Sequence, residues 1–171
     1  SEKLSYWQKT AEEIRNGIMN KGWNPLKEAF TQHYDTDALD ASALLIPLFG
    51  FLPTSDERVR STIDRTVAEL SWNGLLRRYR TDETDDGLKG SEGAFLWCSF
   101  WLVRNLIRLG KVEDAVELYE RLLGYGNHLG LLSEMVDPVS GEVLGNFPQA
   151  LTHLAVIITG IELTEAMRKS R

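Results

Sequence analysis

Cysteine, histidine and proline are scarce in this chain of 171 residues, which has one, three and five of them. A single cysteine excludes an internal disulfide, and Cys98 lies in the apolar run F-L-W-C-S-F-W, so we expect a buried, unreactive thiol. The three histidines lie far apart and follow no spacing typical of zinc ligands. The sequence therefore predicts no disulfide, no metal site and no cofactor.

Positive charge is also scarce, because 19 lysines and arginines stand against 25 aspartates and glutamates, for a net charge of −6. The densest basic group is Arg77, Arg78 and Arg80, which is too small to follow a nucleic-acid backbone. No apolar run reaches the length expected of a membrane span, and the polar start S-E-K-L-S-Y-W-Q-K-T is unlike a signal peptide. We therefore expect a cytoplasmic protein without nucleic-acid or membrane partners.

The rest of the composition, 43% hydrophobic and 26% charged, is typical of one globular domain over residues 1–171. Periodicity and end signals predict six helices, at about 6–20, 37–49, 54–72, 92–109, 112–125 and 146–168. Thr54 and Glu57 form a capping-box pattern, while Asn146 is the predicted N-cap of the last helix, with Pro148 in its first turn. No strand is expected apart from a short excursion at 139–144.

The predicted helices are of two kinds that alternate along the chain. The first, third and fifth are amphipathic with one wet side, whereas the second, fourth and sixth are apolar nearly all round. This alternation predicts an all-α fold of helical hairpins in two layers, with the apolar helices inside. Polar residues at the starts of the inner helices, among them Asp40, Glu92 and Asn146, would then gather at one rim.

Two polar loops interrupt the helical pattern. The loop at 77–92 places Arg78 beside an aromatic residue, which suits the binding of hydroxyls and carboxylates; the alternative is a solvated run of charges. The loop at 129–153 places Glu134 between Leu132 and Met135. A carboxylate with apolar neighbours on a loop is a common arrangement for acid–base chemistry, and the alternative is a surface glutamate near a turn.

Four ordered motifs resemble the bacterial members of glycoside hydrolase family 15, the glucoamylase and α-glucosidase group. They are L-D-A-S-A-L-L-I-P-L at 39–48, L-L-R-R-Y at 75–79, S-E-G-A-F-L-W-C-S-F-W-L-V at 91–103 and G-L-L-S-E-M-V-D-P-V-S-G-E-V-L-G-N-F-P-Q-A-L-T-H at 130–153. The resemblance implies an α/α barrel of six helical hairpins, which agrees with the two-layer pattern. Because this chain supplies only half of those helices, the resemblance implies the C-terminal half of a catalytic domain.

The resemblance also implies hydrolysis of α-glucosides, such as maltooligosaccharides, dextrin or trehalose, with inversion. Two carboxylic acids, roughly 6.5–9.5 Å apart, carry out such a reaction. Glu134 falls on the position of the general base, and Arg78 on an arginine that binds substrate hydroxyls. The layering argument adds Asp40 and Glu92 near the mouth of the pocket.

One part of the family pattern is missing. The family's general acid lies in a tryptophan–glutamate motif upstream of this region, and this chain contains no such motif. Without an acid the leaving oxygen stays unprotonated, so we expect little or no hydrolysis by the isolated chain. The first residue is Ser1 rather than methionine, which is consistent with a trimmed chain or a piece of a larger protein. An apolar strip left uncovered would favour a homo-oligomer.

Two other interpretations remain open. A half-barrel that binds sugar without cleaving it would share every motif and differ only in the missing acid. The stretch from Leu109 to Leu131 contains A-V-E-L-Y-E-R-L-L, which resembles one helix of a tetratricopeptide repeat and would suit an α-solenoid that binds a partner. Such a protein should repeat at a fixed period, and no second copy is seen.

Overall fold

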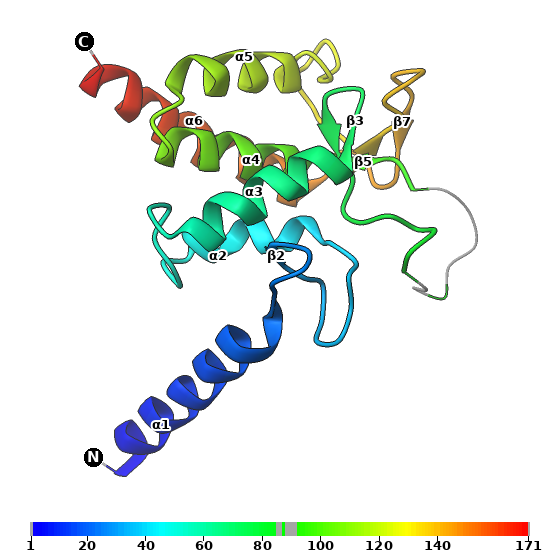
Figure 1. Ribbon diagram of the computed structural model, residues 1–171. Helices are drawn as coiled ribbons and strands as arrows, with labels where there is room; N and C mark the ends of the chain where they lie inside the picture. The colour runs from blue at the N-terminus through cyan, green and yellow to red at the C-terminus, as the bar shows by residue number, and fades with distance from the viewer. Residues whose placement is uncertain (1, 85–86, 88–91, 171) are drawn as a thin grey trace.

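The computed structural model describes residues 2–84, 87 and 92–170, and its main elements are helices (Figure 1). The helices are α1 (Glu2–Gly17), α2 (Leu45–Leu48), α3 (Glu57–Leu70), α4 (Leu96–Arg108), α5 (Val112–Leu123) and α6 (Ala150–Lys169), with a π-helical turn at Ile18–Gly22 and a 3-10 turn at Ala41–Leu44. The strands have two residues each: β1 (Trp23–Asn24), β2 (Ala29–Phe30), β3 (Ser71–Trp72), β4 (Leu75–Leu76), β5 (Ala94–Phe95), β6 (Met135–Val136) and β7 (Val143–Leu144). The predicted all-α class is therefore confirmed.

Helix α4 lies at the centre of the packed helices. It contacts α5 and α6 on one side and α2 with the 3-10 turn on the other. Leu96, Phe100 and Val103 are fully buried, as expected for a helix that is apolar nearly all round. The buried Asn105 side chain donates from Nδ2 to the carbonyl oxygen of Leu44 at 3.0 Å, which ties α4 to the 3-10 turn. Helices α4 and α5 form one hairpin, and α6 packs against both of them.

Three helices begin later than the sequence predicted, because other side chains cap them. Asp40 caps the 3-10 turn by accepting from the amide of Ser42, so residues 37–40 are not helical. Asp56, rather than Thr54, is the N-cap of α3, and Gln149, rather than Asn146, is the N-cap of α6. The amide groups of Asn146 are used elsewhere, in the site described below.

The expectation of almost no strand is wrong around the loop that carries Glu134. There β5, β6 and β7 form a three-stranded antiparallel sheet, in which Phe95 pairs with Met135 and Met135 pairs with Leu144. The predicted excursion at 139–144 is the turn of the β6–β7 hairpin and its second strand. Because Ala94 and Phe95 pair as a strand, α4 starts at Leu96 rather than near Glu92.

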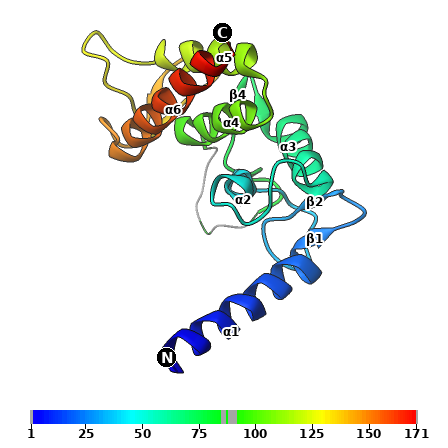
Figure 2. The same cartoon turned by 90° about the vertical axis from the view of Figure 1, so that its left-hand side faces the viewer.

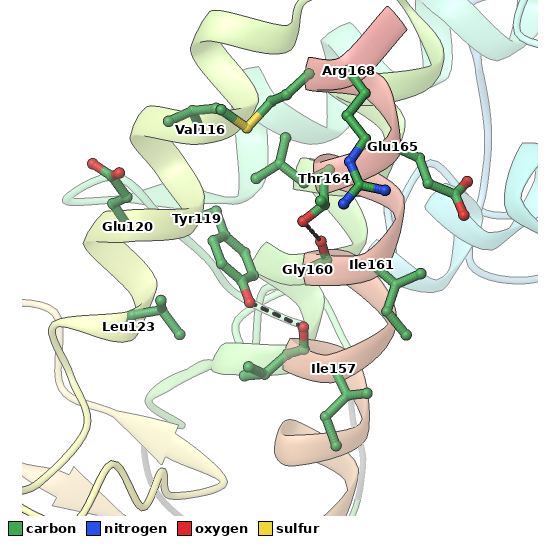
Figure 3. A pocket seen from close by; sticks show the side chains of 13 residues that line it. Val116, Tyr119, Glu120, Leu123, Ile157, Gly160, Ile161, Thr164, Glu165 and Arg168 are labelled. Carbon is green, nitrogen blue, oxygen red and sulfur yellow. Dashed lines mark hydrogen bonds between the residues drawn. The ribbon is translucent and has the colours of Figure 1, made fainter.

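Two surfaces of the molecule are left uncovered. Helix α1 extends away from the other helices in both views and buries none of its residues (Figures 1 and 2). Helix α6 was predicted to be buried on every face, and this is wrong: Leu154 is 53% exposed, and Ile157 and Ile161 are each 57% exposed. A groove of about 750 Å³ runs between α5 and α6, with Tyr119 reaching across to the carbonyl oxygen of Val156 (Figure 3).

Within the described ranges, α6 is the one helix that is long and apolar enough to cross a membrane by length and composition. Its 20 residues contain a window of 18 residues with a mean hydropathy of 1.3, so the expectation that no segment reaches this length is wrong. Glu162 in the same helix accepts two hydrogen bonds from the guanidinium of Arg104 in α4, at 2.6 and 2.9 Å. This ion pair joins α6 to α4, the helix against which it packs.

The cap of α3 makes stability depend on pH. Hydrogen bonds from the guanidinium and the backbone of Arg58 hold the pKa of Asp56 below its usual value of 3.8. A lowered folded-state pKa stabilises the fold above the unfolded-state pKa, and this contribution is lost as pH falls below 3.8 through the folded-state value.

We predict that Asp56→Asn keeps the capping oxygen but removes this dependence. Urea unfolding at pH 7 and at about pH 3 should show that the wild-type chain loses more stability on acidification than the variant does. Asp56→Ala, which also loses the cap, should cost about 1 kcal/mol at pH 7. Equal acid losses in the wild type and Asp56→Asn would contradict the assignment.

Candidate active site

The carboxylate of Glu134 is held at the end of the β6–β7 hairpin. Its Oε2 accepts two hydrogen bonds from one residue: the backbone amide of Asn146 at 3.0 Å and the side-chain Nδ2 of Asn146 at 2.8 Å. The backbone of Glu134 is fixed on both sides, because its amide donates to Asn146 and its carbonyl oxygen accepts from Leu96 at 3.2 Å. The side chain is half-buried. A fixed carboxylate that water can reach is able to act as a base.

The segment that leads into Glu134 is anchored to the start of α6. His153 accepts from the amide of Leu132 through Nε2 and donates to the carbonyl oxygen of Gln149 through Nδ1, so its tautomer is set by these partners. The hydroxyl of Thr152 donates to the carbonyl oxygen of Ser133 at 2.9 Å. His153 is therefore a structural histidine, because both of its ring nitrogens have hydrogen-bond partners. It keeps the backbone before Glu134 in place.

The guanidinium of Arg78 lies close to two aromatic rings. Its Cζ is 4.4 Å from the ring centroid of Tyr79 and 5.0 Å from that of Phe95. Nη2 donates to Oε1 of Glu92 at 2.8 Å and also to the hydroxyl of Tyr79. Its Nε is buried and finds no acceptor in the part of the chain that the structure describes. The guanidinium is thus held in one orientation by the two rings and by Glu92.

Strand β5 brings the Glu134 loop and the Arg78 loop together. Phe95, which lies under the guanidinium of Arg78, pairs with Met135, the residue after Glu134. The next amide, that of Leu96, donates to the carbonyl oxygen of Glu134. Two of the predicted site residues therefore come from segments that meet at one short strand, at the start of the central helix.

Asp40 lies next to Arg78 through the backbone. It forms an antiparallel bridge with Tyr79, and the amide of Ala41 donates to the carbonyl oxygen of Arg78 at 2.7 Å. The carboxylate itself is engaged locally: Oδ1 caps the 3-10 turn and Oδ2 accepts from Gln32 at 3.5 Å. Asp40 and Glu92 are thus each linked to Arg78 or its neighbour, by the backbone bridge and by the ion pair. That Asp40, Glu92 and Asn146 gather at one rim stays a prediction. A role for Asp40 in substrate binding stays a prediction.

Several residues of this region were not predicted from the sequence. Phe95 supports the guanidinium of Arg78 together with Tyr79, the aromatic neighbour noted in the sequence, and Asn146 holds Glu134. The ring centroid of Trp72 lies 4.4 Å from Cζ of Arg77. A small cavity of about 100 Å³ between the loops is lined by Trp72, Arg77, Tyr79, Thr81, Glu92 and Gly93. The sequence could have indicated the aromatic contacts, because Tyr79 is next to Arg78 in the chain. The role of Asn146 depends on how the two strands of the hairpin pair, which the sequence does not show.

Cys98 takes no part in this site. It is fully buried, and this burial raises the pKa of its thiol far above the ordinary value. The prediction of an unreactive thiol is therefore supported by its surroundings. Among residues 2–84, 87 and 92–170, no group of three histidine, cysteine, aspartate or glutamate side chains is placed to hold a metal ion.

Comparison with known proteins shows the family of this chain. The model of the glycosyl hydrolases family 15 matches residues 1–161. A trehalase of Mycobacterium tuberculosis is 48% identical over 160 residues, which is 94% of this chain and 23% of that protein. A trehalase of Thermoplasma volcanium is 42% identical over 170 residues, which is 99% of this chain and 27% of that protein. The chain thus spans about a quarter of the length of these relatives.

Solved structures show the same fold. A wild-type glycosidase superposes with a TM-score of 0.77 at 22% identity, over 94% of this chain and 44% of that chain. A glycosidase variant in complex with glucose gives a TM-score of 0.78 at 20% identity, with the same coverage. The helical arrangement therefore fits an α/α barrel-type fold.

The ion pair between Arg78 and Glu92 should contribute to stability. The two side chains are 35% and 20% exposed, so Glu92→Gln would leave a partly buried guanidinium without its charged partner. We predict a loss of about 1–2 kcal/mol in unfolding free energy, measured in urea at pH 7. Asp82→Asn, which breaks the more exposed pair with Arg80, is the matched control and should leave the unfolding midpoint unchanged. Equal midpoints for wild type and Glu92→Gln would contradict the assigned pair.

Proposed function

Because the chain belongs to glycosyl hydrolase family 15, we propose that it is part of a glycoside hydrolase that releases glucose from α-glucosides. Trehalose is the substrate to test first, since the curated relatives at 42% to 48% identity are named trehalases. Maltooligosaccharides and dextrin are the other substrates of this proposal. The observation that carries it is the fixed carboxylate of Glu134 beside the arginine loop.

In this proposal Glu134 is the general base of an inverting reaction. An inverting enzyme activates a water on the face of the sugar ring opposite to the leaving group, and a carboxylate takes the proton of that water. Glu134 has the two features that this role needs, a fixed orientation and access to solvent. Arg78 would bind substrate hydroxyls, and Glu92 would hold Arg78 in place. Asp40 would lie at the mouth of the pocket.

The general acid is proposed to come from outside these 171 residues. The chain has no tryptophan–glutamate motif of the kind that carries the acid in this family. Its relatives are about four times as long, which leaves ample sequence for that residue. The isolated chain would then be inactive, because a base alone leaves the departing oxygen unprotonated.

The exposed apolar face of α6 also supports the proposal that further parts of the catalytic domain lie outside these 171 residues. Helix α6 exposes several large apolar side chains, among them Leu151, Leu154, Ile157, Ile158 and Ile161, and an exposed apolar face is typical of a surface against which another part packs. We propose that the remainder of the catalytic domain covers this face and completes the barrel. A second copy of the chain is the alternative occupant. A cytoplasmic location stays a prediction.

A half-barrel that binds sugar without cleaving it is the second candidate function. It is favoured by the missing acid and shares the geometry of Arg78 and Glu134 with the first. The two candidates differ in the full-length protein, where only the enzyme releases glucose. The α-solenoid alternative has no support in the family match or in the solved structures.

We predict that Glu134→Gln abolishes hydrolysis by the full-length protein. With trehalose and maltooligosaccharides as substrates, glucose release should fall about 100- to 10,000-fold, because the amide cannot accept the proton of the attacking water. Glu142→Gln, an exposed glutamate on the same hairpin, is the control and should keep full activity. The isolated 171-residue chain should release no glucose. Undiminished activity in Glu134→Gln would remove Glu134 from the mechanism, and an inactive wild-type protein would favour the sugar-binding alternative.

A further inference from the structure

We infer that Asn146 is the residue that positions the catalytic carboxylate, and that Oε1 of Glu134 is the oxygen that takes the proton from water. This inference rests on the proposed role of Glu134 as base and deepens it by separating the work of the two carboxylate oxygens. It is argued from the hydrogen bonds between Asn146 and Glu134 at the end of the hairpin and from the close approach of Gly145 to the Glu134 carboxylate.

The register of the hairpin changes by one residue at Gly145. Val136 pairs with Val143 and Met135 with Leu144, so the regular continuation would place Glu134 opposite Gly145. Instead the amide of Glu134 donates to the carbonyl oxygen of Asn146 at 2.9 Å. Gly145 is therefore one extra residue on its strand, with φ at +71°, as in a β-bulge. Bulges of this kind re-aim a neighbouring side chain, and here the neighbour is Asn146.

The bulge turns both amide groups of Asn146 toward one carboxylate oxygen. The carbonyl oxygen of Glu134 accepts from Leu96, and the backbone N–H of Asn146 donates to the Glu134 side chain. Nδ2 of Asn146 donates to the same atom, Oε2, at 2.8 Å. A Cβ on Gly145 would lie 2.7 Å from Oε2, so only glycine leaves room for the carboxylate in this position.

The two oxygens of Glu134 therefore differ. Oε2 holds two donors, which is what two lone pairs can accept in the carboxylate plane. In the described part of the chain, Oε1 receives no hydrogen bond, and the side chain is half-buried rather than enclosed. Oε2 is thus the fixed end of the carboxylate and Oε1 the end that faces a ligand or water. A base whose direction is fixed in advance spends no energy on orientation in the transition state.

In the chemical step, each bond that forms is matched by one that breaks. The oxygen of water bonds to the anomeric carbon, its O–H bond breaks, and the proton passes to Oε1 of Glu134. The glycosidic C–O bond breaks with its electron pair going to the leaving oxygen, which takes a proton from the general acid supplied outside these residues. Asn146 touches neither water nor sugar in this step, so it is a positioning residue.

Two variants of the full-length protein test the inference. Asn146→Ala loses the Nδ2 bond and keeps the backbone bond, while Asn146→Asp replaces the Nδ2 donor by an acceptor that repels Oε2. We expect kcat on trehalose to fall about 10-fold in the first and about 100-fold in the second, with KM within about twofold of wild type. Asn73→Gly is the matched control, because Asn73 also donates through Nδ2 to this hairpin, at Pro138, without reaching Glu134. It should keep the wild-type kcat.

The double variant separates positioning from a general loss of structure. If Asn146 acts through Glu134, adding Asn146→Ala to Glu134→Gln should slow the reaction by less than about twofold more, since residues that act as a unit are not additive. Unchanged kcat in both Asn146 variants, or a full 10-fold loss added to Glu134→Gln, would overturn the inference alone. Wild-type activity in Glu134→Gln would instead overturn the proposed base and, with it, the inference. Equal unfolding midpoints of the variants and wild type would confirm that the fold is intact.

Discussion

The pairing of β5 with β6 holds the candidate site together. It joins Phe95 to Met135 and places the amide of Leu96 against the carbonyl oxygen of Glu134, so the start of the central helix and the end of the hairpin share one ladder. Backbone groups at a helix start need partners, and here the Glu134 loop supplies one of them. The same strand carries the ring that supports Arg78. Two loops that are far apart in the sequence are thereby fixed relative to one another by a few backbone hydrogen bonds.

Much of the helical fold could be predicted, because it follows from local patterns. Helix α3 shows one apolar stripe, and Val59, Ile63 and Leu70 are buried as that stripe requires. In α5 the stripe expected at Val112, Val116, Tyr119 and Leu123 is not the buried face: Ala115, Leu118 and Leu122 are buried instead. A strand of two residues is too short to show an alternation of apolar and polar residues, so the sheet around Met135 could not be predicted from the sequence pattern. Helix α6 was expected to be buried because it is apolar nearly all round, but many of its apolar side chains are exposed.

The candidate site was predicted unevenly for a physical reason. Arg78 and Glu134 lie within family motifs and in polar loops, so the sequence alone indicated them as candidates. Asn146 read as a helix cap because asparagine before a proline-containing turn favours that role. Its actual contacts arise from a register change at Gly145, which only the paired backbone reveals. The residues proposed to touch a ligand were therefore easier to find than the residue proposed to orient Glu134.

The central claim is that a fixed carboxylate activates water for inversion. The most direct test is proton NMR of the sugar first released by the full-length protein from trehalose, before mutarotation. Inversion at one anomeric carbon should give α- and β-glucose in equal amounts, since the leaving glucose keeps its α configuration. Release of α-glucose alone would show retention and would contradict the role of Glu134 as a base acting on water.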